Sequence, residues 1–136
     1  FICDFKKNKN KIDYLTNSIK QSYPLGMNVE VFSLESLIIS EKKSKSKFEK
    51  EHVTPYIKDS KNNFRIKSKD YVENLFHIRL TVDEECDFDL IKNIIENLYP
   101  KNNDFSLEEI LFYLNKNKNL LNLNEGIKQK HLEHYL

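Results

Sequence analysis

The clearest pattern along the chain is an apolar run followed by an acidic segment and then by apolar residues at helical spacing. Residues 75–82 (LFHIRLTV) form a dense β-favouring run, which predicts a strand. Beyond the acidic segment, apolar side chains recur at positions 88, 91, 94, 95 and 98, the spacing of an amphipathic helix, and Pro100 is expected to close it. Because a strand that leads directly into a helix is an α/β unit, the pattern predicts an α/β fold.

Three shorter strands are predicted before this unit. The segments rich in β-favouring residues are 11–17, 29–33 and 62–69, and the last has the polar approach of an edge strand. Residues 23–26 (YPLG) combine Pro and Gly, so we expect a turn there that leads the chain into the second of these strands.

Helix start and stop signals lie between these strands. Ser33 is expected to cap a short helix over residues 34–43. Residues 46–57 also have helical spacing, but the internal Pro55 should end or kink that helix near Thr54.

A further helix is predicted near the end of the chain. Ser106 and Glu109 form a capping box before the apolar-periodic residues 107–117. Residues 120–136 become polar, and we expect a partly ordered tail. These elements divide the chain into an α/β part, residues 1–103, and a helical C-terminal extension, residues 104–136.

Composition narrows the class of protein. The 136 residues carry 22 Lys and Arg against 21 Asp and Glu, so the net charge is only +1, as expected for a near-neutral globular protein. Only Arg65 and Arg79 are arginines, although arginine is the residue that best supplies bidentate phosphate and base contacts. We therefore expect no nucleic-acid partner.

Cysteine usage and apolar runs bear on the compartment. Cys3 and Cys86 belong to neither a CxxC pair nor a zinc-binding spacing, which fits a reducing environment. No apolar run approaches the roughly 18 to 20 residues of a membrane span, and no signal peptide is visible. We therefore expect a cytoplasmic protein without a membrane partner. Because the first residue is Phe1 rather than Met, we also expect further sequence upstream.

The acidic segment between the predicted strand and helix is where chemistry is expected. Ligands of α/β folds bind at the carboxyl ends of strands, where Asp83 lies, and Asp87 would follow in the first turn of a helix that starts near Glu85. Two such carboxylates could hold one Mg²⁺ together with substrate phosphate oxygens. The alternative is that Asp83 is the helix N-cap and that the later acids of the segment complement the helix dipole.

Three other residues could contact a ligand. Glu51 and His52 lie together in KEHVTPY, where His52 could donate a hydrogen bond to a hydroxyl or carboxylate. A Glu-His pair on a Lys-rich helix is, however, more typical of a protein surface. Glu30 is expected on the strand face opposite Val29 and Val31, toward a ligand or solvent.

Self-sufficient catalytic motifs are absent from the sequence. His131 and His134 are three residues apart, but they lack the HExxH arrangement and a third ligand, so a plain tail is the preferred interpretation. There is no Gly-rich phosphate loop, no GxSxG segment and no nucleophile paired with a base. We therefore predict no catalytic residue within this chain.

Four segments resemble, in the same order, parts of one protein family. They are DYLTN (13–17), SYPLGMNVEVFSLESL (22–37), KEHVTPYI (50–57) and HIRLTVDEECDFDLIKNI (77–94). Together they resemble the C-terminal half of the cytidylyltransferases that activate acidic sugars such as acylneuraminate and 3-deoxy-manno-octulosonate, most closely the spore-coat polysaccharide biosynthesis F branch. LNLNEGIKQK (121–130) continues the match, so the resemblance covers nearly the whole chain. It implies the C-terminal part of a nucleotidyltransferase domain, a mixed sheet flanked by helices with a helical C-terminal tail.

The resemblance also implies roles for particular residues. It makes Asp83 a magnesium ligand, with Asp87 as its companion at the helix start. It further implies a set of substrate contacts, mostly on the sugar side: Gly26, Glu30, Glu51, His52 and Arg79.

The reaction that the resemblance implies joins CTP to an acidic sugar. In this family a sugar hydroxyl attacks the α-phosphate of CTP and pyrophosphate leaves, while Mg²⁺ neutralises the triphosphate. The resemblance therefore implies CTP, an acidic sugar and Mg²⁺ as ligands, a homodimer, and a role in surface or spore polysaccharide synthesis. The family's phosphate loop and the Asp of its Gly-Asp-x-Pro segment have no counterpart here, so we expect this chain alone to be inactive.

Two departures from the family pattern leave other hypotheses open. Asn28 stands where the pattern has Asp, and Glu85-Cys86 replaces Pro-Glu. One alternative is a non-catalytic binding or assembly module derived from the same fold. Another is a divergent protein of a glycan pathway, in which Asn28 signals lost or altered activity.

Overall fold

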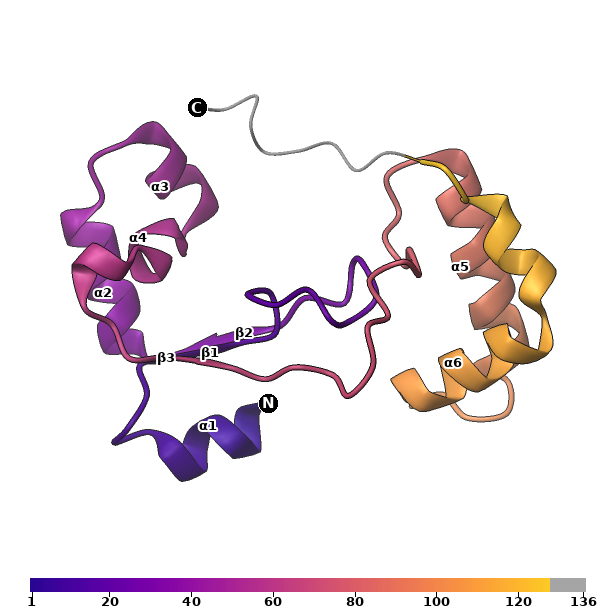
Figure 1. Cartoon of the computed structure of the whole chain (residues 1–136), viewed down its shortest axis with the longest axis horizontal. Helices are drawn as coiled ribbons and strands as arrows, with labels where there is room; N and C mark the ends of the chain where they lie inside the picture. The colour runs from indigo at the N-terminus through magenta and orange to yellow at the C-terminus, as the bar shows by residue number, and fades with distance from the viewer. Residues whose placement is uncertain (128–136) are drawn as a thin grey trace. The chain divides into compact units, whose positions relative to one another are not determined.

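The computed structural model describes residues 1–127, and it has the predicted α/β class. These residues form two compact units, drawn in Figure 1. The first unit comprises residues 1–23 and 28–74, and the second comprises residues 24–27 and 75–127. The predicted boundary between residues 103 and 104 concerns a different division of the chain and stays a prediction.

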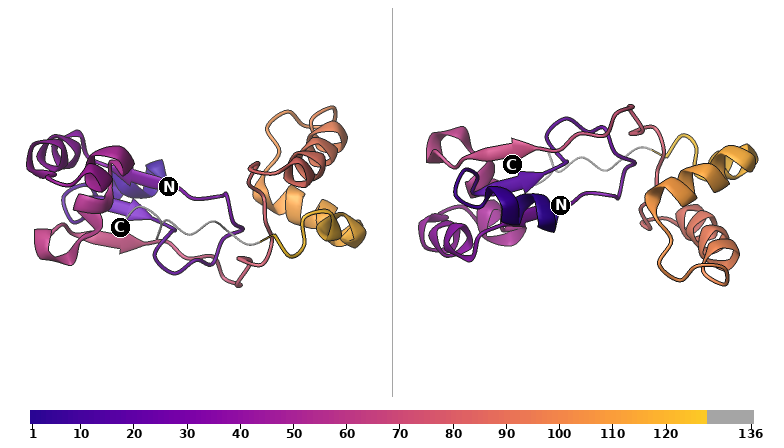
Figure 2. Two further views of the ribbon diagram at one scale, coloured as in Figure 1. Left: turned by 90° about the horizontal axis from the view of Figure 1, so that it is seen from above. Right: turned by 90° about the horizontal axis from the view of Figure 1, so that it is seen from below.

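A three-stranded mixed sheet lies at the centre of the first unit. Strand β1 (Tyr14–Thr16) pairs antiparallel with β2 (Glu30–Phe32) and parallel with β3 (Ile66–Ser68), so β3 is an edge strand as predicted. Both views of Figure 2 show the three strands side by side. All three residues of β1 are buried, whereas β2 and β3 are partly exposed, because only the central strand is covered by neighbours on both edges.

Side chains at either end of β1 fix its pairing with the two edge strands. The Asp13 carboxylate accepts hydrogen bonds from the backbone N–H, Nε and Nη2 of Arg65, at 2.8, 2.9 and 2.6 Å, and this joins β1 to the start of β3. Asn17 Oδ1 accepts from the backbone N–H of Val29 at 2.8 Å, and this joins β1 to the approach of β2. The segment DYLTN thus has a structural role, since strands of three residues have few ladder hydrogen bonds of their own.

Five short helices surround this sheet in sequence order. They are α1 (Ile2–Asn8), α2 (Leu34–Lys43), α3 (Lys47–His52), α4 (Pro55–Lys58) and the 3₁₀ helix η1 (Ser60–Asn62). The predicted break at Pro55 is confirmed, because α3 ends before it and α4 begins at it. Helix α1 was not predicted, since its Lys-rich sequence buries only Phe5, which joins Ile12 and Leu15 in a small apolar cluster.

Helix α2 packs through small polar residues rather than through its apolar ones. Ser33 caps it as predicted, accepting from the backbone N–H of Ser36 at 3.0 Å. The apolar side chains of Leu34 and Ile38 are nevertheless 71% and 43% exposed, while Ser36 and Ser40 are buried. Ser40 Oγ donates to the carbonyl of the Val53 residue at 3.1 Å, a close approach that a larger side chain would prevent.

The second unit is built from two helices and a 3₁₀ segment. They are α5 (Glu85–Leu98), α6 (Leu107–Lys116) and η2 (Lys118–Leu123), and both α-helices were predicted. The capping box that starts α6 is present: Ser106 Oγ accepts from the N–H of Glu109, whose carboxylate accepts from the N–H of Ser106. Buried apolar side chains on these two helices form the core of the unit: Leu90, Ile94, Ile110 and Leu114.

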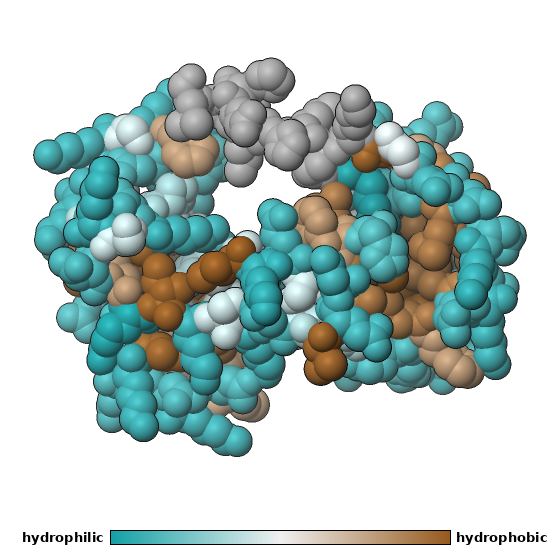
Figure 3. All heavy atoms as spheres, viewed as in Figure 1, coloured by the Kyte–Doolittle hydropathy of each residue, from teal (hydrophilic) through white to brown (hydrophobic). Residues whose placement is uncertain are grey.

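Only part of the apolar pattern of α5 faces this core. Leu90 and Ile94 are buried together with Asp87, whereas Phe88 and Ile95 are 55% and 45% exposed. The prediction that the whole apolar set packs inward is therefore wrong. Figure 3 shows apolar surface over the helices of this unit. No helix of the described residues is both long and apolar enough to cross a membrane.

Residues 75–82 do not form the strand that the sequence predicts. Their β-structure is limited to one parallel bridge between Leu25 and Arg79, flanked by hydrogen bonds from Leu25 N–H to the Ile78 carbonyl (2.9 Å) and from Leu80 N–H to the Leu25 carbonyl (2.8 Å). A strand needs a paired neighbour along its length. Within the described part of this unit, the partner is a turn of four residues, which is too short for a ladder.

Gly26 in this turn is required by the approach of the chain's own backbone. Its φ is +97°, and a Cβ at this position would lie 2.8 Å from the carbonyl carbon of Leu80 and from the backbone nitrogen of Thr81. Backbone atoms cannot move aside as a flexible side chain can. The turn that the sequence predicts is therefore confirmed, with a glycine at the point of closest contact.

We expect Gly26→Ala to destabilise the protein strongly. A left-handed backbone costs an alanine about 1 to 2 kcal/mol, and the clash with Leu80 adds to that cost. The matched control is Gly126→Ala, because Gly126 also has a positive φ (+83°) but has open space around its Cβ position. Urea unfolding of both variants should show the larger loss at Gly26, and equal losses would contradict the close contact.

Candidate functional site

The junction that leads into helix α5 gathers three of the predicted site residues. Arg79 Nε and Nη2 each donate to the Asp87 carboxylate at 2.8 Å, and Nη2 also donates to Asp83 Oδ2 at 3.1 Å. The Asp87 side chain is fully buried and that of Arg79 is 7% exposed. A bidentate pair between a guanidinium and a carboxylate is among the strongest and most directional polar contacts in proteins.

Further donors surround the Asp87 carboxylate. Asn124 Nδ2 donates to Oδ1 at 2.8 Å, and the backbone N–H groups of Asp83 and Glu84 donate to Oδ2 at 3.2 and 3.1 Å. Arg79, and then these other donors, hold the pKa of Asp87 well below its usual value, although burial acts in the opposite direction. The same pair raises the pKa of Arg79. Both carboxylate oxygens of Asp87 are thus occupied, which leaves no room for a metal ion.

Asp83 is the open carboxylate of the pair. Its side chain is half-exposed, and the hydrogen bonds that it accepts from Arg79 and from Thr81 Oγ1 (3.1 Å each) both go to Oδ2. Within the described residues this leaves Oδ1 for an added ligand. Because Arg79 carries one positive charge and the two aspartates carry two negative charges, the junction as a whole has a net charge of about −1.

The helix start differs by one residue from the alternative interpretation. Glu84, not Asp83, is the N-cap of α5, so the N-cap role suggested for Asp83 is wrong. Glu85 and Asp87 do lie in the first turn, where acidic side chains complement the helix dipole. Asp87 also accepts from the N–H of the N-cap residue, as the acid of a capping box does.

A magnesium ion fits this junction only as a shared site. Among residues 1–127, no group of three or more His, Cys, Asp and Glu side chains could hold a metal ion. Mg²⁺ commonly takes one or two carboxylates, with waters and substrate phosphates as its other ligands, so Asp83 suits the role of a single protein ligand. His131 and His134 lie outside the described residues.

In the first unit, the predicted residue Glu30 forms an ion pair that the sequence did not indicate. Glu30 Oε1 on β2 lies 2.5 Å from Lys58 Nζ on α4, and both side chains are partly exposed. Burial acts to raise the pKa of Glu30, but the Lys58 ammonium and nearby hydroxyl groups outweigh it, so the pKa is lowered. Lys58 is one of many lysines in the chain, and no spacing marked it in advance.

Tyr14 lies beside this ion pair on the neighbouring strand. The residue is fully buried, and its hydroxyl has no hydrogen-bond partner among the described residues. Burial, and then the charge of the Glu30 carboxylate, raise the pKa of Tyr14. An unpaired buried hydroxyl is costly, so this position is a local weak point of the first unit.

Glu51 and His52 occupy the last turn of α3. Glu51 is exposed, and the His52 ring lies 4.6 Å from the ring of Phe48, measured between centroids. Val53 follows with a φ of +65°, which is strained for a β-branched residue. The strain lies inside the family-like segment KEHVTPY, where the chain reverses between α3 and α4.

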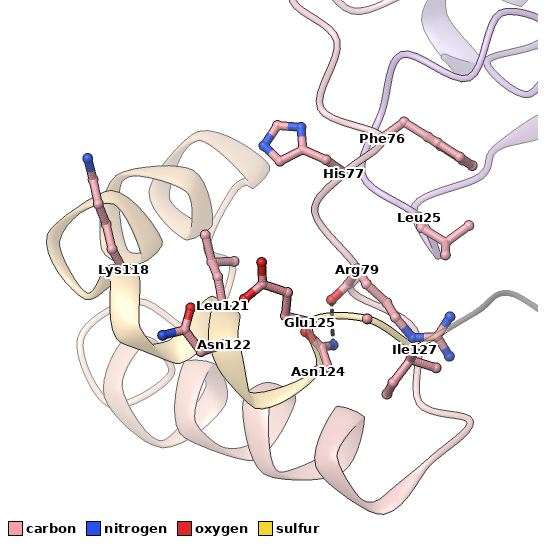
Figure 4. A pocket seen from close by; sticks show the side chains of 11 residues that line it. Leu25, Phe76, His77, Arg79, Lys118, Leu121, Asn122, Asn124, Glu125 and Ile127 are labelled. Carbon is pink, nitrogen blue, oxygen red and sulfur yellow. Dashed lines mark hydrogen bonds between the residues drawn. The ribbon is translucent and has the colours of Figure 1, made fainter.

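A pocket of about 510 Å³ lies within the second unit, beside Arg79 (Figure 4). Its walls combine apolar side chains with His77 and Glu125. Asn124 also lines it, and its amide donates to the Arg79 carbonyl at 3.1 Å, the dashed line in Figure 4. The 3₁₀ segment and the junction thus share one polar contact point.

The predicted residues therefore fall into two groups. Arg79, Asp83 and Asp87 come together in the second unit, which also contains Gly26, whereas the first unit contains the others: Glu30, Glu51 and His52. Gly26 approaches the backbone of its own unit, and its proposed contact with a substrate stays a prediction. Sequence reasoning missed Asn124, although LNLNEG had been noted as part of the family match.

Comparison with known proteins supports the fold. No family model matches the chain. It is 34% identical over 124 residues to the uncharacterized protein MJ1063 of Methanocaldococcus jannaschii, a match that covers 90% of this chain and 49% of that protein. A solved cytidylyltransferase from Leptospira borgpetersenii serovar Hardjo-bovis matches with a TM-score of 0.82 at 23% identity, over 96% of this chain and 52% of that chain.

Two conclusions follow from these matches. The chain has the mixed α/β fold of part of a cytidylyltransferase, so the predicted fold class is confirmed. It spans about half the length of each protein that it matches.

We expect Asp87→Asn to lower the free energy of unfolding at pH 7 by about 3 kcal/mol, because it leaves a buried guanidinium without its main partner. The folded-state pKa of Asp87 is depressed, so its stabilisation is present above the unfolded value of about 3.9 and is lost as the pH falls further. The difference between wild type and variant should therefore shrink from about pH 5 to about pH 2.

Urea unfolding at several pH values measures this difference. Asp89→Asn is the control, because Asp89 is exposed on the same helix and makes the same change of charge. A difference between wild type and Asp87→Asn that stays constant down to pH 2 would contradict the depressed pKa.

We expect Tyr14→Phe to raise the free energy of unfolding by roughly 1 kcal/mol, because it removes a buried hydroxyl that has no partner. Tyr113→Phe is the matched control: its hydroxyl donates to Asn93 Oδ1 at 2.7 Å, so the same change should cost roughly 1 kcal/mol. Thermal unfolding of both variants tests the difference in sign. A loss at Tyr14 would show that its hydroxyl has a partner in solution.

Proposed function

We propose that this chain is part of a sugar cytidylyltransferase, to which it contributes a metal-side carboxylate and part of the sugar-binding wall. One observation carries the proposal. On a chain with part of a cytidylyltransferase fold, Asp83 presents an open carboxylate at the start of a helix, held by an arginine whose charge a second, closed aspartate balances. The four family-like segments of the sequence support the same assignment.

The reaction proposed for the complete protein is the transfer of a cytidylyl group to an acidic sugar. A sugar hydroxyl oxygen forms a bond to the α-phosphorus of CTP and loses its proton, while the bond from that phosphorus to the β-phosphate oxygen breaks and pyrophosphate leaves. A bound Mg²⁺ would supply neutralisation of the triphosphate charge, and Asp83 would hold it. Arg79 fixes the orientation of Asp83 through the 3.1 Å hydrogen bond. Chemistry of this type depends mainly on positioning and on electrostatic stabilisation.

The sugar side is assigned to the residues of the first unit. Glu30 and Lys58 together offer hydrogen-bond acceptors and donors at a half-exposed position, which suits recognition of hydroxyl groups and of an acid group. Glu51 and His52 are proposed as further contacts, and Gly26 as a point of close backbone approach. The sugar itself is assigned no further than its acidic class.

The proposal extends to the setting of the protein. Because the chain spans about half the length of its matches, and because it lacks the family's phosphate loop, we propose that it is inactive alone and acts within a longer, homodimeric, cytoplasmic protein. The pathway proposed is surface or spore polysaccharide synthesis. A family-like phosphate loop in the sequence encoded upstream of Phe1 would support the proposal.

In the complete protein, we expect Asp83→Asn to reduce Mg²⁺-dependent release of pyrophosphate from CTP and an acidic sugar by about 100-fold or more, which corresponds to about 2.7 kcal/mol of transition-state stabilisation. The loss follows from removal of the open carboxylate. Asp89→Asn makes the same change of charge six positions later on the exposed side of α5, and it should leave turnover unchanged.

Two outcomes would overturn the proposal. Wild-type turnover in Asp83→Asn would remove the metal role. A complete protein that folds and releases no pyrophosphate with any acidic sugar would favour a non-catalytic binding or assembly module on the same fold.

A further inference from the structure

The closed shell around Asp87 sets its role apart from that of Asp83. Five hydrogen bonds reach its two oxygens, two from Arg79 and one each from Asn124 and the N–H groups of Asp83 and Glu84. A carboxylate offers about four lone-pair positions. Because the side chain is also fully buried, no ligand can reach it without breaking this shell.

The charge of Asp87 determines what the charge of Asp83 can do. Arg79 Nη2 lies 2.8 Å from Asp87 and 3.1 Å from Asp83, so one cation is shared between two anions. If Asp87 were neutral, Arg79 would be balanced by Asp83 alone, and the junction would attract a second cation only weakly. With Asp87 ionised, one negative charge remains, and the open side chain is that of Asp83.

Asn124 keeps this arrangement in place from another part of the chain. Its residue is 5% exposed, and Nδ2 donates both to Asp87 Oδ1 (2.8 Å) and to the Arg79 carbonyl (3.1 Å). Figure 4 shows the second contact beside the pocket. A neutral amide can fill this place without changing the charge of the junction, whereas an aspartate could donate to neither oxygen.

We propose that Asp87 and Asn124 are positioning residues: Asp87 balances Arg79, Asn124 holds both of them, and together they leave Asp83 oriented and charged to receive a divalent cation. The inference deepens the proposed function and rests on it in one respect, the role of Asp83 as the ligand. It assigns no ligand role to Asp87, in contrast to the sequence-based prediction. It also gives the 3₁₀ segment η2 a function at the junction, because Asn124 follows η2 directly.

The first arm of the test needs no metal. Hydrogen exchange of the Asp83 and Glu84 amides, which donate to Asp87, is measured by NMR on the ¹⁵N-labelled chain. In Asn124→Ala we expect exchange at these amides to rise roughly fivefold to tenfold relative to amides in the middle of α6. The control is Asn122→Ala, an exposed residue of the same segment, which should change nothing. Unchanged exchange at Asp83 and Glu84 in Asn124→Ala overturns the inference.

The second arm uses Mn²⁺ as the probe, because its paramagnetic broadening reports weak binding residue by residue. In the wild-type chain we expect broadening centred on residues 81–84, absent in Asp83→Asn. Asp87→Asn and Asn124→Ala keep the Asp83 carboxylate, yet the Mn²⁺ concentration for half broadening should rise about fivefold or more in each. A purely structural role for Asn124 and Asp87 would leave this concentration unchanged in variants that remain folded, and so would overturn the inference.

The two arms separate the two claims. Broadening that persists in Asp83→Asn but disappears in Asp87→Asn would make Asp87 the ligand and overturn the inference. Faster exchange in Asn124→Ala without any broadening near Asp83 in the wild type would refute the metal role in the proposed function, while the holding of Asp83 by Asn124 and Asp87 would stand.

Discussion

The buried ion pair between Arg79 and Asp87 is the contact on which the second unit depends. It joins residues 75–82, which have only one β-bridge, to the first turn of α5, and Asn124 adds the segment after η2 to the same carboxylate. A buried charge pair is stabilising only when its remaining hydrogen-bonding groups are satisfied, and here the backbone and an amide satisfy the carboxylate. The geometry of the open Asp83 carboxylate is a consequence of this closed pair.

The first unit relies on a different device for the same purpose. Its strands have three residues each, so side-chain clamps from Asp13 and Asn17 supplement the ladder. Family-like sequence thus has two uses in this chain: DYLTN stabilises a short sheet, whereas KEHVTPY contains a strained turn at Val53. Strain of this kind tends to accumulate near functional sites, which agrees with the sugar-side role proposed for this unit.

Local signals predicted much of the fold. The capping residues Ser33 and Ser106, the break at Pro55 and the turn at Gly26 all act within a few residues, and each is present in the structure. Failures arose where longer-range partners decide. Residues 75–82 have strand propensity but lack a neighbour long enough to pair with in their unit, and Phe88 on α5 fits an apolar periodicity but does not face the core. Of the candidate site, the sequence indicated Arg79, Asp83 and Asp87, but not the partners Asn124 and Lys58.

The sequence by itself determined the class of fold, the positions of most helices and the acidic junction, because these follow from periodicity, capping chemistry and residue type. Only the tertiary structure decided which aspartate is open and which is closed. Asp83 and Asp87 are the same chemical group four positions apart, and they differ because one faces solvent and the other faces five donors. Burial and hydrogen-bond partners come from segments distant in the chain, and no local pattern encodes them.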